Sequence, residues 1–144
     1  MDLVSLYQSK LRTPEEAAAR IPSGSRLGMA MAEPPALLKA LADRAEAGKV
    51  ENVRLYYFEA TSIAGRTVLR YELNDRLVPY CMFISAAERA LIKRGMEDGG
   101  RKVVNYVPNN FHQATRLLTE EIGIDTFVCT VSPWRRAPRR SRPR

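Results

Sequence analysis

The sequence is poor in the side chains that bind metals or form disulfides. Its 144 residues include one histidine, His112, and two cysteines, Cys81 and Cys129. A single histidine excludes a site built from several histidines, and the two cysteines lie far apart with no CxxC pair. We therefore predict no bound metal. We expect two reduced, buried thiols, as is usual in a cytoplasmic protein.

Long apolar runs are also missing. No stretch approaches the roughly 20 apolar residues that are needed to span a bilayer. Residues 1–5 lack the basic segment and apolar run of a secretory signal. The length fits one domain, and a hydrophobic content of 45% is too high for a disordered chain. The expectation is a globular cytoplasmic protein without a membrane segment.

The excess of positive charge is confined to the C-terminal end. The sequence carries 23 lysines and arginines against 16 acids, and six of the arginines lie in residues 134–144, which contain no acid. Residues 1–133 are nearly neutral, with 17 basic and 16 acidic side chains. We predict a folded domain over 1–133 and a disordered Arg/Pro-rich tail over 134–144. Nucleic acid would bind such a tail weakly and in a salt-dependent way, so it is the least favoured partner.

Segments with strand character alternate with segments of helical periodicity. This alternation is typical of an α/β fold, with a mostly parallel sheet flanked by helices on both faces and joined by right-handed crossovers. Residues 59–81 show no clear pattern. The predicted strands are 26–31, 53–58, 82–84, 102–107 and 126–131. Ligands bind at the carboxyl ends of such strands, which points to loops 28–34, 59–66, 84–86 and 107–112.

Helix ends are marked more clearly than strands. A short helix is predicted over residues 2–10. Thr13 with Glu16, and Ser85 with Glu88, have the spacing of capping boxes that open two further helices. Three glycines are predicted to end helices, namely Gly48, Gly95 and Gly123.

The loop over residues 28–35 is the most informative candidate site. A small residue such as Gly28 lets a ligand approach the backbone, and the next helix begins with unpaired N–H groups. Together they could hold a phosphate, a carboxylate or a developing oxyanion. The alternative is a tight turn packed under the helix, because no GxGxxG or Walker pattern is present. Glu33 would either cap the helix or orient a substrate.

His112 and Asn109 form a second candidate, on a predicted strand-to-helix loop at the same edge of the sheet. A lone histidine there is either a binding residue or a surface residue. No acid and nucleophile nearby form a convincing triad with it.

Several segments, in order, resemble the N-terminal half of the acetyl-CoA hydrolase/transferase family, especially members similar to 4-hydroxybutyrate CoA-transferase. Each motif is short, and the ordered set covers about residues 5–133. The matching segments are Tyr7–Lys10, Thr13–Ala17, Ile21–Ser25 with Gly28, Glu33–Pro34, Phe83–Ser85 with Arg89, Gly95 and Asp98, Tyr106–Pro108, Asp125, and Val131–Pro133.

The resemblance implies two similar α/β domains with the active site between them. It also implies an open sheet like that of the related sugar-phosphate isomerases. It also implies a mechanism in which a glutamate takes CoA from an acyl-CoA and passes it to a small carboxylate or to water. Coenzyme A is then a substrate, and no tightly bound cofactor is expected. The residues carried over to the cleft are Gly28, Met29, Ala30, Glu33 and Pro34, with Asn109 and His112.

The chain departs from the family at two points. Some relatives carry histidine and glycine where this sequence has Met29 and Ala32, so only backbone contacts are expected to survive there. The catalytic glutamate belongs to the second domain of the family, and residues 134–144 do not match the family at all. We therefore expect a truncated family member without a catalytic residue of its own, prone to self-association. The alternative is a free-standing α/β module for a phosphorylated or nucleotide ligand.

Overall fold

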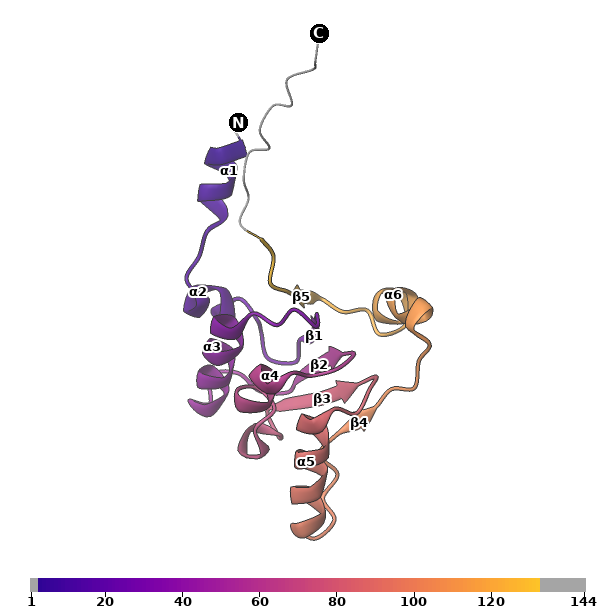
Figure 1. Ribbon diagram of the computed structural model, residues 1–144. Coiled ribbons are helices and arrows are strands. Elements are labelled where there is room, and N and C mark those ends of the chain that lie inside the picture. Colours follow the sequence, from indigo (N-terminus) through magenta and orange to yellow (C-terminus); the bar gives the residue numbers. More distant parts are fainter. Residues whose placement is uncertain (1–2, 133–144) are drawn as a thin grey trace.

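The fold is an α/β fold with a five-stranded, all-parallel sheet, as the sequence predicts. A computed structural model describes residues 3–132 (Figure 1), so the prediction for residues 134–144 lies outside the described residues. The strand order is β4-β3-β2-β1-β5. The strands are β1 (Arg26–Met29), β2 (Val53–Tyr57), β3 (Leu77–Cys81), β4 (Asn105–Tyr106) and β5 (Thr126–Val128).

Helical segments connect the strands, and both predicted capping boxes are confirmed. Thr13 caps the helix that follows it, with Glu16 returning the bond, and Ser85 and Glu88 do the same further along the chain. None of the described helices is both long and apolar enough to cross a membrane. The helical segments are α1 (Leu3–Lys10), α2 (Pro14–Ala19), α3 (Pro35–Glu46), α4 (Ser62–Arg66), η1 (Tyr71–Leu73), α5 (Ala86–Glu97), η2 (Phe111–Gln113), α6 (Ala114–Arg116) and η3 (Leu117–Glu121).

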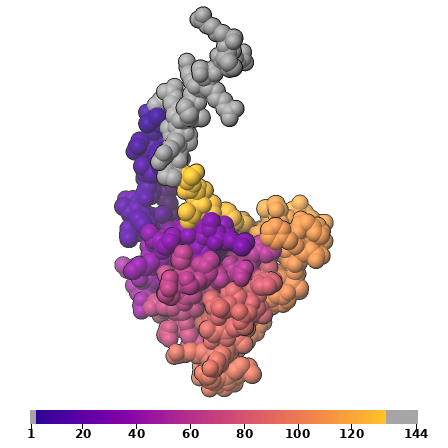
Figure 2. All heavy atoms as spheres, in the orientation of Figure 1, coloured from indigo at the N-terminus to yellow at the C-terminus, as the bar shows by residue number. Residues whose placement is uncertain are grey.

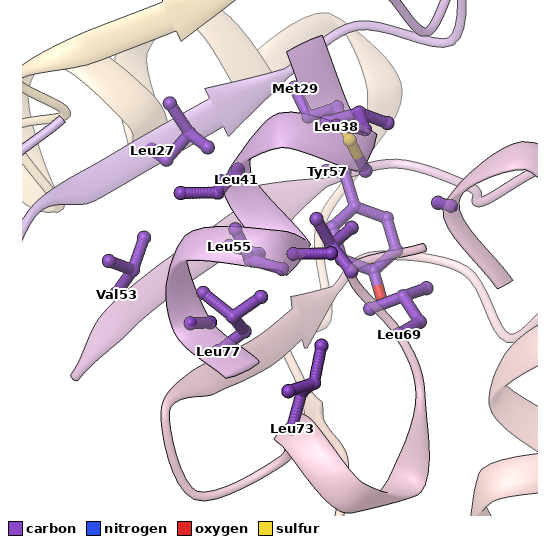
Figure 3. Packing of buried hydrophobic residues seen from close by; sticks show 14 of the residues in the cluster. Leu27, Met29, Leu38, Leu41, Val53, Leu55, Tyr57, Leu69, Leu73 and Leu77 are labelled. Atoms are coloured by element: carbon purple, nitrogen blue, oxygen red, sulfur yellow. The ribbon is translucent and has the colours of Figure 1, made fainter. Parts of the chain in front are cut away.

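The winding of the sheet places its core on one face. From β1 to β4 each strand is added on the same side of the previous one, so right-handed crossovers carry α3, α4 and α5 over the same face. Leu27, Leu55, Tyr57 and Leu77 point from the strands into this core (Figure 3). The connection from β4 to β5 runs in the opposite direction and passes over the other face, where Ile124 lies against Gly28.

The third strand was predicted at the wrong place. It runs over Leu77–Cys81 rather than 82–84. Pro79 hides it in the sequence, because proline lacks an N–H and is rare inside a sheet. In the structure Pro79 pairs with Leu55 of β2, while the pairing with β4 begins only at Tyr80.

The carboxylate of Glu88 is buried next to the end of β2. Glu88 is fully buried, and it accepts hydrogen bonds from the Tyr57 hydroxyl (2.9 Å) and the Ser85 N–H (2.7 Å). Burial raises the pKa of the Tyr57 hydroxyl, and it raises the pKa of the nearby Cys81 thiol to about 11. Cys81 is buried as expected, but Cys129 is exposed, so the prediction of two buried thiols is wrong for Cys129.

Gly95 has a different role from the one predicted. It does not end its helix, because α5 continues to Glu97. A Cβ atom at Gly95 would lie 2.5 Å from the Arg101 carbonyl oxygen and 3.1 Å from a methyl group of Val103. Glycine here lets the returning chain pass against the helix. Gly48 and Gly123 have positive φ angles (69° and 63°) where helical segments end, as predicted.

We predict that Gly95→Ala lowers the free energy of unfolding by about 1–3 kcal/mol, because a backbone carbonyl must move to admit the methyl group. Gly65→Ala is the matched control, since its Cβ would meet only the Ala87 side chain, at 3.3 Å. Urea unfolding followed by circular dichroism measures both variants. Equal stability of the two would contradict this account of Gly95.

Candidate functional site

The candidate site lies where the winding of the sheet reverses. β1 is hydrogen-bonded to β2 on one side and to β5 on the other, although β5 comes last in the sequence. In open parallel sheets, ligands bind at the carboxyl edge next to such a reversal, because the connections diverge there and leave a crevice. The loop after β1, predicted from sequence as a site, therefore occupies the position where the fold favours ligand binding.

Three hydrogen bonds attach this loop to the segment after β5. The Ala30 N–H donates to the Val128 carbonyl (3.0 Å), and the Thr130 N–H donates to the Ala32 carbonyl (2.7 Å). The Thr130 hydroxyl donates to the Glu33 carbonyl (2.8 Å). The loop is thus held along its length by backbone that is about 100 residues away in the sequence.

Glu33 fixes the other side of the loop. Its side chain is buried, and its carboxylate accepts hydrogen bonds from the Thr61 N–H (2.7 Å), the Thr61 hydroxyl (2.6 Å) and the Ala64 N–H (2.8 Å). Glu33 therefore caps α4 rather than the helix that follows it in the sequence. All three contacts are internal, so in this arrangement the carboxylate joins the loops after β1 and β2.

Gly28 makes room for side chains of the protein. A Cβ atom there would lie 2.8 Å from the Ile124 Cδ1 atom and 2.9 Å from the Phe127 Cδ2 atom. Pro34 and Pro35 occupy the cap and first position of α3, and neither residue has an N–H group. The beginning of α3 consequently offers fewer donors to an anion than a typical helix N-terminus.

An apolar pocket of about 460 Å³ opens beside the loop. Met29, Ala30 and Met31 form one wall, and the segment from η2 to η3 forms the other. The rings of Phe58 and Phe111 meet within it, with their centroids 4.6 Å apart. The remaining lining residues are Tyr57, Ala114, Thr115, Leu118, Thr119, Ile124 and Phe127.

Asn109 and His112 lie apart from this pocket. His112 is exposed on η2 and is not among the residues that line it. Asn109 lines a separate hollow of about 310 Å³, and its side-chain amide lies 3.7 Å from the Met82 sulfur atom. Phe111, which lies between these two residues in the sequence, does line the pocket. It was not predicted as a site residue. An apolar side chain directly after two asparagines is the only signal that could have indicated it.

The lining of the pocket is mostly apolar. Within residues 3–132, no three acidic, histidine or cysteine side chains gather closely enough to hold a metal ion. The carboxylate closest to the loop, Glu33, is engaged in capping α4. The apolar pocket suits the hydrocarbon portion of a small molecule, whose reactive end would then lie at the strand edge.

Comparison with solved structures identifies relatives of this chain. RipA from Yersinia pestis matches with 69% identity and a TM-score of 0.86 over 88% of this chain. The chain is a relative of the N-terminal part of RipA, a CoA-transferase of the acetyl-CoA hydrolase/transferase family. A single-residue variant of RipA matches with 68% identity and the same TM-score, over 88% of this chain and 29% of the variant.

The match is limited to part of RipA. The chain spans about 30% of the length of RipA. No family model matches the chain, and no curated protein matches it either. The family predicted from the ordered motifs is nevertheless confirmed by the RipA structures.

We predict that Glu33→Gln lowers the free energy of unfolding by about 1–3 kcal/mol, because an amide cannot replace two carboxylate oxygens as acceptors. Glu59→Gln removes an exposed carboxylate nearby and serves as the control. Chemical denaturation measures both. A Glu33→Gln protein as stable as the control would show that the capping of α4 contributes little.

Proposed function

We propose that this chain forms the N-terminal, acyl-side wall of a CoA-transferase active site. The observation that carries the proposal is the 69% identity to RipA over 88% of the chain, combined with an apolar pocket at the reversal point of the sheet. The substrates would be an acyl-CoA and a small carboxylate of the 4-hydroxybutyrate or acetate type. Transfer to water would make the same site a hydrolase.

The chemistry would be nucleophilic catalysis by a glutamate supplied from another domain. Its carboxylate attacks the thioester carbonyl, CoA thiolate leaves, and an acyl-glutamyl anhydride forms. The thiolate then attacks the glutamyl carbonyl and releases the first acid. The resulting glutamyl thioester passes CoA to the acceptor by the reverse steps. Splitting one hard transfer into several easier ones is the advantage of covalent catalysis.

The described residues would contribute binding and position. Met29, Ala30 and Met31 would contact the acyl group through the apolar pocket, while Glu33 and Pro34 would hold the loop in place. Gly28 would act indirectly, by admitting the side chains that shape the pocket floor. Asn109 and His112 would lie outside this pocket, Asn109 at the neighbouring hollow and His112 on the exposed surface of η2.

A binding module for a phosphorylated or nucleotide ligand is the second candidate. It is favoured only by the position of the loop at the reversal point. The apolar lining of the pocket and the two prolines at the start of α3 speak against a phosphate ligand there.

A chimera tests the proposed function. In it, residues 1–132 of this chain replace the matching N-terminal part of RipA. We predict that the chimera exchanges CoA between butanoyl-CoA and acetate, while the chain alone does not, because the nucleophile lies elsewhere. Chromatography of the acyl-CoA products measures exchange. A folded chimera without exchange, or a chain that binds a nucleotide tightly, would contradict the proposal.

The pocket can be tested in the same chimera. Thr115 is exposed at the pocket wall, so Thr115→Trp should fill the pocket without disturbing the core. We predict a loss of at least about tenfold in kcat/KM for butanoyl-CoA, which corresponds to about 1.4 kcal/mol of transition-state binding. Gln113→Trp places the same side chain at the neighbouring hollow and should change kcat/KM less than about twofold. Equal effects would exclude the pocket as the acyl site.

A further inference from the structure

Glu88 is buried more deeply than the capping of a helix requires. The chain contains two capping boxes, and Glu16 in the first of them is exposed to solvent. Glu88 in the second box is fully buried, and none of the ion pairs within residues 3–132 includes it. Burying a carboxylate without a cation costs free energy, unless hydrogen bonds inside the protein replace those to water. Capping alone therefore does not account for the burial of Glu88.

A second hydrogen bond distinguishes Glu88 from Glu16. One oxygen of the Glu88 carboxylate accepts from the Ser85 N–H, as the cap requires, and the other accepts from the Tyr57 hydroxyl at 2.9 Å. Burial and the neighbouring Glu88 raise the pKa of this hydroxyl, so it stays protonated and donates. Tyr57 is the last residue of β2, and Ser85 lies in the loop after β3. One buried carboxylate therefore joins the end of β2 to that loop.

Two backbone hydrogen bonds cross the same junction. The Met82 N–H donates to the Tyr57 carbonyl (3.0 Å), and the Phe83 N–H donates to the Phe58 carbonyl (2.8 Å). We call residues 57–58 and 82–85 the β2–β3 joint. Phe58 lines the apolar pocket, where its ring meets that of Phe111. The position of this pocket wall is therefore set at the joint.

Buried carboxylates hold the chain on both sides of Phe58. Glu88 binds the Tyr57 side chain immediately before it, and Glu33 accepts two hydrogen bonds from Thr61 three residues after it. We propose that Glu88 is a positioning residue for the pocket, which acts through Tyr57 to fix the β2–β3 joint and with it the Phe58 wall. The proposal rests on the proposed function for the nature of the group that the pocket receives.

A hydrogen bond to a buried carboxylate suits this role better than packing alone. An apolar contact tolerates a small displacement, whereas a hydrogen bond weakens steeply when its distance or angle changes. Tyr57 is 2% exposed and Glu88 is fully buried, so neither group can exchange its partner for water. A buried acceptor that loses its donor is costly. The joint is consequently held in one arrangement beside a pocket that is open to ligands.

Amide hydrogen exchange of the full chain, measured by NMR, tests the positioning role. Tyr57→Phe removes the hydroxyl and keeps the ring. We expect the amides of Met82 and Phe83 to lose protection at least about tenfold, because opening the joint then no longer breaks a bond to a buried carboxylate. The Ala30 amide, which donates to Val128 on the other side of the pocket, should change less than about twofold.

Tyr71→Phe is the matched control. It removes another tyrosine hydroxyl that donates to a carboxylate, that of Asp98 at the opposite end of α5. The control should leave the protection of Met82 and Phe83 within about twofold of the unaltered chain, as expected for a distant, independent site.

A double variant tests whether Glu88 acts through Tyr57. Glu88→Ala removes the acceptor, so adding Tyr57→Phe should lower the protection of Met82 and Phe83 by less than a further factor of about two. Independent, additive losses in the double variant would show that Glu88 acts by another route, and would overturn the proposal.

The effect on the pocket is measured in the chimera with RipA. Tyr57→Phe should lower kcat/KM for butanoyl-CoA at least about threefold relative to kcat/KM for acetyl-CoA, because the longer acyl group has more contact with the Phe58 wall. Tyr71→Phe should leave this ratio unchanged. A loss of stability alone would lower both values by the same factor, so the ratio separates positioning from a purely structural role.

Two further results would overturn the proposal. One is protection of Met82 and Phe83 that is unchanged in Tyr57→Phe, or lost equally at Ala30. The other is an active chimera whose preference between the two acyl-CoA substrates does not change. Amide exchange does not depend on turnover. A chimera without CoA exchange, together with a loss of protection confined to the joint, would contradict the proposed function and leave the positioning by Glu88 supported.

Discussion

The right-handed crossover is the constraint on which the rest of the structure depends. Each step from β1 to β4 moves in the same direction across the sheet, so the connecting helices gather on one face and bury one core. The reversal after β4 then brings β5 to the free side of β1. That single reversal produces the pocket at the carboxyl edge, beside the loop after β1.

The reversal also explains how the loop after β1 is held in place. The loop after β1 lies between two neighbours that come from distant parts of the sequence. The segment after β5 bonds its backbone on one side, and α4 binds the Glu33 carboxylate on the other. Figure 2 shows the segment after β5 and the α6 region on opposite sides of the hollowed upper surface. A group that positions a substrate must be held firmly, because a displacement of about 1 Å can lower the reaction rate about a hundredfold.

The sequence predicted features that depend on a few neighbouring residues. The two capping boxes and the strands around Leu27 and Leu55 could be predicted because propensity, spacing and burial agree locally. The strand with Pro79 was missed, since its tolerance for proline depends on where β4 begins to pair. Gly95 was read as a helix end, whereas its role depends on the Arg101 carbonyl returning past the helix. The pocket is a long-range property, because Phe58 and Phe111 meet only after the chain has crossed the sheet.

The residues predicted to form an anion site have other roles in the structure. An anion site was predicted from Gly28, Glu33 and the start of α3. In the structure Gly28 makes room for the Phe127 side chain, and the Glu33 carboxylate caps α4. Two prolines at the start of α3 lack the N–H groups that an anion would need. What remains at the strand edge is apolar, with Met29 and Met31 lining the pocket. An apolar side chain there is compatible with the proposed role of a wall for an acyl group. In the proposed function such a wall needs only packing. A nucleophile would need a carboxylate free of other partners, whereas the buried carboxylates of Glu33 and Glu88 both accept hydrogen bonds inside the protein.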